Sequence, residues 1–109
     1  MKNGLMTDIF GVKSWFLNDQ LHKDNGPAVE YDDGSKWWYL NGKLHCTNGP
    51  AIEYPNGYKA WYENGERHRL DGPAVKWAGG DKEWWINGKY INCHSQEEFE
   101  RLINLGSFW

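Results

Sequence analysis

Apolar and polar residues alternate along most of the chain in a pattern that repeats every 23 residues. Each unit is centred on one tryptophan, and these residues are Trp15, Trp38, Trp61 and Trp84. Another aromatic residue follows each of them, and an asparagine comes two positions later. Three of these asparagines precede glycine, a pair that favours a tight hairpin because both turn positions tolerate positive φ. The alternation predicts β-hairpins, and the fixed period predicts that they stack into one array.

A second turn is expected at the other end of each unit, at Gly34, Gly57 and Gly80. A three-residue loop with glycine in the left-handed position suits these sequences. That loop would place Glu53 opposite Lys59, a favourable pair of charges across two strands. In the last unit, the same register makes Lys76 face Lys82 instead.

The repeat stops near residue 90, and a helical pattern follows. Ser95 and Glu98 form a capping box, and Gly106 is placed to end the helix. An apolar stripe runs between them: Phe99, Leu102, Ile103 and Leu105. We therefore predict an all-β fold, an elongated single-layer antiparallel meander of 23-residue hairpin repeats. Residues 1–109 form one repeat domain, with β repeats over about 10–90 and a capping α-helix over about 95–105.

Composition narrows the possible partners. The 109 residues carry a formal net charge of −3, so no overall positive field attracts nucleic acid or anionic lipid. No apolar stretch reaches membrane-spanning length, and no secretory leader is evident. Cys46 and Cys93 occupy different phases of the repeat, which favours free thiols over a disulfide framework. We expect a soluble cytoplasmic protein that binds neither nucleic acid nor membrane.

Neither catalysis nor metal binding is predicted from the polar residues. Equivalent positions in neighbouring units are about 10 Å apart, too far for His22, His45 and His68 to share a metal ion. We expect each histidine to brace its own loop against the Gly-Pro that follows. Cys46 is next to His45, but neighbours on a strand point to opposite faces. We predict no enzyme activity, no catalytic residue, no metal site and no cofactor.

Two regular columns should share one face of the sheet. Lysines lie two residues before the tryptophans, at Lys13, Lys36, Lys59 and Lys82. Such a face could stack nucleobases on indole rings while the lysines hold phosphate. The predicted register instead places Ala28 opposite Trp38 and Ala51 opposite Trp61, so that the rings pack over methyl groups. We favour packing, and keep a nucleotide-binding sponge as the alternative.

Positions that differ between the units are free to be shaped for a partner, whereas the shared positions are explained by the fold. Several variable positions lie on the opposite face among tyrosines, with arginines at the rim. Aromatic rings rimmed by arginine are typical of protein interface hot spots. The predicted partner-binding residues are Trp37, Tyr39, Tyr54, Tyr58, Tyr62, Arg67 and Arg69.

The string W-x-x-N-G-K-x-H, with later glycines and a 23-residue period, resembles MORN repeats over about residues 10–90. It is similar in particular to the variant repeats of bacterial, large-virus and phage proteins. The resemblance implies a β-hairpin array that serves as a binding scaffold. A phage accessory protein that inhibits a host defence factor, in the host cytoplasm, is one function it suggests. Because a single-layer sheet buries little surface, we also expect a homodimer or a partner-bound state.

Overall fold

The computed structural model describes residues 1–106 and contains fourteen strands and one helix within them. The strands of the first two units are β1 (Gly4–Thr7), β2 (Lys13–Leu17), β3 (Gln20–Leu21), β4 (Val29–Glu30), β5 (Lys36–Trp37), β6 (Tyr39–Leu40) and β7 (Lys43–Leu44). Those of the later units are β8 (Ile52–Glu53), β9 (Lys59–Ala60), β10 (Tyr62–Glu63), β11 (Glu66–Arg67), β12 (Val75–Lys76), β13 (Lys82–Ile86) and β14 (Lys89–Ile91). Helix α1 spans Gln96–Asn104.

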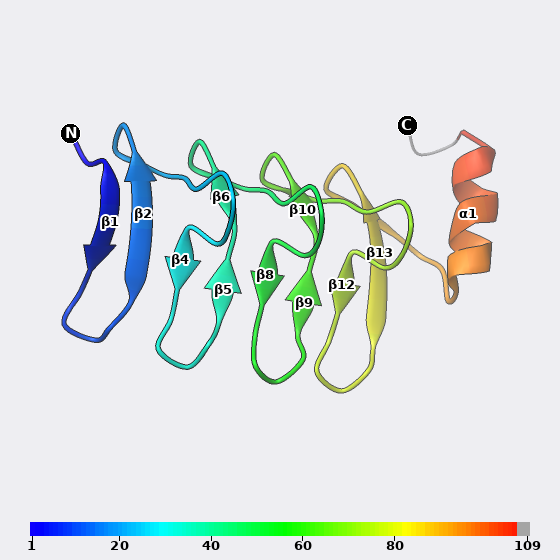
Figure 1. Ribbon diagram of the computed structural model, residues 1–109. Helices are drawn as coiled ribbons and strands as arrows, with labels where there is room; N and C mark the ends of the chain where they lie inside the picture. Colours follow the sequence, from blue (N-terminus) through cyan, green and yellow to red (C-terminus); the bar gives the residue numbers. More distant parts are fainter. Residues whose placement is uncertain (107–109) are drawn as a thin grey trace.

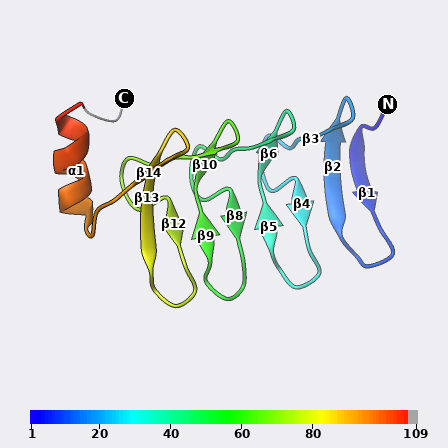
Figure 2. The same cartoon turned by 180° about the vertical axis from the view of Figure 1, so that it is seen from behind.

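Most strands form one antiparallel sheet in the order β1-β2-β4-β5-β8-β9-β12-β13-β14, with β3 paired to β2. Figure 1 shows the hairpins side by side, with β1 at one end and α1 at the other. Figure 2 shows β3 and β14, the short strands that return beside β2 and β13. The described chain measures 47 × 29 × 18 Å, and its radius of gyration of 15.5 Å exceeds the roughly 13 Å of a compact chain this long. The predicted elongated single-layer meander is confirmed.

Both predicted turn types are present. The turns at Asn-Gly, drawn at the upper edge of the sheet in Figure 1, have positive φ at asparagine and glycine, for example 50° and 81° at Asn41 and Gly42. The lower turns carry a left-handed glycine, with φ of 99° at Gly57, and the register pairs Glu53 with Lys59. Each of these lower loops contains three residues, one more than a two-residue hairpin. This length fixes which face of the sheet each side chain occupies.

Each long strand of the middle units is interrupted at its tryptophan, because the chain changes partners there. The N–H of Trp38 donates to Ala51 O of the next unit at 2.7 Å, whereas its carbonyl accepts from His45 N of its own hairpin at 3.1 Å. The lower half of the unit therefore belongs to the long sheet, and the upper half forms the separate two-stranded pairs β6-β7 and β10-β11.

The histidines join successive units, a contact that the repeat spacing does not predict. Nε2 of His22 and of His45 also lies against the histidine's own loop, 3.0 Å from Asp24 and 3.4 Å from Thr47, so the expected bracing is present at these two positions. Nδ1 of His45 accepts a hydrogen bond from Asn64 N, in the upper turn of the following unit, at 3.0 Å. The equivalent bonds are Asn41 N to His22 Nδ1 at 2.9 Å and Asn87 N to His68 Nδ1 at 3.0 Å. Asn64 is 19 residues after His45 along the chain, but the two residues are adjacent in space. Each of these three hydrogen bonds joins one repeat unit to the next, and we call this contact the histidine staple.

The first turn of this kind, at Asn18 and Asp19, is held by N-terminal residues in place of a histidine. Asn18 N donates to the Oδ1 of Asn3 at 2.9 Å, and Asp19 N donates to Lys2 O at 2.9 Å. Strand β1 follows at once and pairs with β2, so the array begins at Gly4–Thr7, earlier than the predicted boundary near residue 10. This strand lacks the tryptophan motif, so the repeat pattern gives no sign of it.

Helix α1 closes the other end. Ser95 caps it by accepting from Glu98 N at 3.1 Å, while the Glu98 carboxylate accepts from His94 N at 2.8 Å. The helix buries Phe99 completely against a cluster formed by Trp84, Ile86, Ile91 and Cys93. Leu102 and Ile103 pack against the same cluster. Leu105 was expected in the apolar stripe but is 71% exposed, because the helix ends there and the residue becomes its C-cap.

Candidate functional site

One face of the sheet carries a continuous band of aromatic rings, here named the aromatic face: Tyr31, Trp37, Tyr39, Tyr54, Tyr58 and Trp77. The closest contacts in the band are between Tyr54 and Tyr58, with centroids 5.2 Å apart, and between Tyr58 and Trp77, 5.0 Å apart. Trp37 joins Tyr31, Tyr39 and Tyr54 at 6.1–6.4 Å. The rings therefore link three consecutive units into one surface.

The repeat itself explains why these rings meet. Tyr31, Tyr54 and Trp77 occupy one phase of the 23-residue unit, two residues after a buried Val29, Ile52 or Val75. Residues two apart on a strand share a face, so the three rings follow the core residues beneath them. The prediction included Tyr54 of this column but missed Tyr31 and Trp77. The shared phase is the signal that could have found both.

The aromatic face is also the cover of a small core. Trp37, Tyr54, Tyr58 and Tyr62 are half-buried and pack against a cluster of Ile52, Ala60 and Val75. Trp37, Tyr58 and Tyr62 are predicted partner-binding residues, and these contacts give them a second role as the cover of buried apolar residues. A single-layer sheet has no second sheet to bury its apolar residues, so its own large side chains must do so.

The outermost rings remain available. Tyr31 is 40% exposed and Trp77 is 42% exposed. A hollow of about 330 Å³ lies between Tyr54, Tyr58 and Trp77, with Asn56 and Ala78 completing its walls. The indole Nε1 of Trp77 donates to Glu83 at 2.9 Å, which fixes this ring at the rim. The hollow is therefore apolar on its walls and held in shape by a hydrogen bond.

Electrostatics around the face favour neutral phenols. Burial raises the pKa of Tyr39, Tyr54 and Tyr58 above its usual value. Nε1 of Trp37 is buried without a hydrogen bond of ordinary geometry, although it is close enough to lower the Tyr54 pKa in part. The tyrosines thus present uncharged hydroxyl groups at neutral pH.

Arg67 lies at the edge of the aromatic face, as predicted. Its Nε donates to the Tyr62 hydroxyl at 3.2 Å, and its guanidinium stacks over Trp85 at 4.9 Å. Glu83 is 3.9 Å from Arg67 and also accepts from the Trp85 indole at 2.9 Å. These contacts hold Arg67 in place against the rings.

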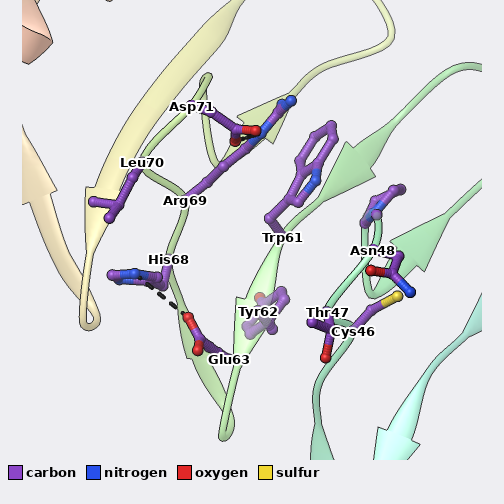
Figure 3. A pocket seen from close by; sticks show the side chains of 12 residues that line it. Cys46, Thr47, Asn48, Trp61, Tyr62, Glu63, His68, Arg69, Leu70 and Asp71 are labelled. Carbon is purple, nitrogen blue, oxygen red and sulfur yellow. Dashed lines mark hydrogen bonds and ion pairs between the residues drawn. The ribbon is translucent and has the colours of Figure 1, made fainter.

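Arg69, predicted to be part of the same rim, lies elsewhere. Its guanidinium lies over the Trp61 ring at 3.9 Å and donates to Asp71 at 3.0 Å and to Pro73 O at 3.2 Å. Figure 3 shows Arg69 directed toward Trp61, across a groove from Cys46 and Asn48. Because Trp61 and Tyr62 are neighbours on a strand, they project from opposite faces, and Arg69 follows Trp61. The structure thus separates Arg69 from the other six predicted residues.

Other chemistry-bearing residues are dispersed. Within residues 1–106, no three histidine, cysteine, aspartate or glutamate side chains gather as a metal site would require. Cys46 and Cys93 are unpaired thiols, and burial raises the pKa of Cys93. No helix in the described part of the chain is long and apolar enough to cross a membrane.

The comparisons with known proteins add no identity to this geometry. No family model, no curated protein and no solved structure gives a significant match to the chain.

Proposed function

We propose that the chain is a non-catalytic binding protein whose aromatic face engages a protein partner. The observation that carries this proposal is the unbroken contact of six aromatic rings on one face of a single-layer sheet. Tyrosine and tryptophan are enriched at interface hot spots because they supply large, rigid contact area at low conformational cost.

The partner's chemistry follows from the shape of the face. The hollow between Tyr54, Tyr58 and Trp77 suits one apolar side chain of a partner, and the surrounding neutral hydroxyl groups can donate to its backbone carbonyls. Three of the six rings of the aromatic face pack on the buried cluster of Ile52, Ala60 and Val75 and are therefore ordered before binding. An ordered face spends little free energy on fixing side chains when a partner docks.

The identity of the partner rests on the MORN resemblance alone. That resemblance supports a scaffold role, and its occurrence in phage proteins supports a host protein as the partner. An accessory protein that inhibits a host defence factor is the form of this function that we propose.

The alternative, a sponge that stacks nucleobases on the tryptophan column, has less support from the geometry. Arg69 covers the Trp61 ring at 3.9 Å, and Lys23 covers the Trp15 ring at 3.8 Å. A base could stack there only after displacing a cation that already occupies the ring face.

Site-directed photo-crosslinking in host cells tests the proposal. A benzophenone side chain placed at Trp77 should form a covalent adduct with one host protein. The matched control is the same probe at Tyr90, a 53% exposed aromatic residue beyond the aromatic face. An adduct that forms equally from both positions, or from Tyr90 alone, would contradict the assignment of the face.

A further inference from the structure

The face opposite the aromatic face, here named the tryptophan face, carries a charge ladder across its strands. Glu30 pairs with Lys13 on one side and with Lys36 on the other. Glu53 pairs in the same way with Lys36 and with Lys59. Positive and negative side chains therefore alternate over the first two units, the arrangement that stabilises neighbouring strands.

The third unit breaks the alternation. Lys76 occupies the phase of Glu30 and Glu53, and it pairs with Lys59 on one side and with Lys82 on the other. Three consecutive strands thus place a lysine in one row, at a spacing of about 4.8 Å per strand. A single change of residue type within the repeat converts an alternating ladder into a run of like charges.

A fourth cation adjoins the row. Nζ of Lys76 is 5.6 Å from the centroid of the Trp61 ring, and the guanidinium of Arg69 lies over the same ring at 3.9 Å. The Trp61 indole is thus a shared platform that directs both cations to one place. We name Lys59, Lys76, Lys82 and Arg69 the cationic cluster.

The row of lysines should lower the stability of the free protein, since like charges directly opposite each other on a sheet are destabilising. The pKa of Lys76 is lowered, first by burial and then by Arg69, Lys59 and Lys82. Glu53 pairs with Lys59 at one end of the cluster. Asp71 bonds Arg69 but is largely exposed, and Glu83 projects to the aromatic face, where it holds two indoles.

We propose that the cationic cluster binds a compact polyphosphate group, the di- or triphosphate of a small soluble molecule. Three ammonium groups in a row and one guanidinium match several adjacent phosphate oxygens, and an anion there replaces repulsion by attraction. This site is on the opposite face from the proposed protein interface and does not depend on it.

The extent of the row favours a short anion over a nucleic acid strand. The row spans three strands, about 10 Å across, and then meets Glu53 beside Lys59. A longer polyanion continuing along the ladder would pass Lys36 and then Glu30, and the net charge of the chain is −3. A nucleic acid backbone would therefore lose at these glutamates part of what it gains at the cluster.

Isothermal titration calorimetry with sodium tripolyphosphate tests the site in low-salt buffer. Lys76→Glu restores the residue type of the other two units, and it should weaken binding by at least about tenfold because it reverses a charge at the centre of the row. Lys76→Met, which only removes the charge, should weaken binding less. The matched control is Lys36→Ala, a lysine of the same face flanked by two glutamates, which should bind as the wild type does.

A second readout separates binding from folding. Without any polyanion, Lys76→Glu should raise the melting temperature, because it restores the alternating ladder. A lowered melting temperature would show that the lysine row is not strained and would overturn the argument. Equal tripolyphosphate binding by wild type and Lys76→Glu would also overturn it. Tighter binding of a single-stranded oligonucleotide than of tripolyphosphate would contradict the proposal that the ligand is a compact polyphosphate.

Discussion

The histidine staple predicts a defined loss of stability when its acceptor is removed. His45→Phe keeps a ring of similar size but deletes the Nδ1 that accepts from Asn64 N at 3.0 Å. A typical intramolecular hydrogen bond contributes about 0.5–1.5 kcal/mol net. Asn64 is exposed, so water can replace part of the lost bond, and we expect the free energy of unfolding to fall by about 1 kcal/mol. For a domain of this size that corresponds to a melting temperature lower by about 4–8 °C.

Urea unfolding followed by tryptophan fluorescence measures this change. Thr47→Val is the matched control, because Thr47 contacts the other ring nitrogen of His45 at a distance of 3.4 Å and should contribute little. Amide hydrogen exchange at Asn64 should become faster in His45→Phe and not in Thr47→Val. An unchanged urea midpoint in His45→Phe, or an equal loss in both variants, would refute the staple.

Three further predictions concern the core, the tyrosines and self-association. Phe99→Ala should cost about 3–5 kcal/mol of unfolding free energy, because its ring is fully buried under α1, and thermal unfolding would show a much smaller loss if the helix were detached. Stability should fall as the pH rises above about 10, because burial raises the pKa of Tyr39, Tyr54 and Tyr58. As the pH rises, the unfolded chain loses phenolic protons that the folded chain still holds, which favours unfolding. A urea midpoint that stays constant between pH 8 and 11 would contradict this loss of stability. Sedimentation at tens of micromolar should show a homodimer, and a clean monomer would contradict the expected self-association.

Much of the fold could be predicted from the sequence because its signals are local. A tight hairpin turn requires positive φ, which Asn-Gly pairs tolerate, and the loop length follows from the charge pairing of Glu53 with Lys59. Strand β1 and the partner of each histidine could not be predicted in the same way. They depend on which segments meet across units, a non-local fact that the spacing of residues within one unit does not contain.

The candidate site was predicted in its composition but not in its energetics. Alternation along the strands placed Trp37, Tyr54 and Tyr58 on one face, and the structure brings them together. It could not reveal that these rings also bury Ile52 and Val75, since burial depends on the absence of a second layer. Arg69 was misplaced for a related reason, because its segment lies outside any strand and period-two alternation does not apply there.

The affinity of the crosslinked partner for two variants tests the central claim most directly. Trp77→Ala removes a 42% exposed ring from the hollow, and Tyr90→Ala removes a 53% exposed ring elsewhere. If the aromatic face is the interface, Trp77→Ala should weaken binding by about 2 kcal/mol or more, roughly thirtyfold in Kd, while Tyr90→Ala leaves it unchanged. Circular dichroism of both variants should remain that of the wild type. Equal affinity of Trp77→Ala and wild type for that partner would contradict the assignment of this face as the binding surface.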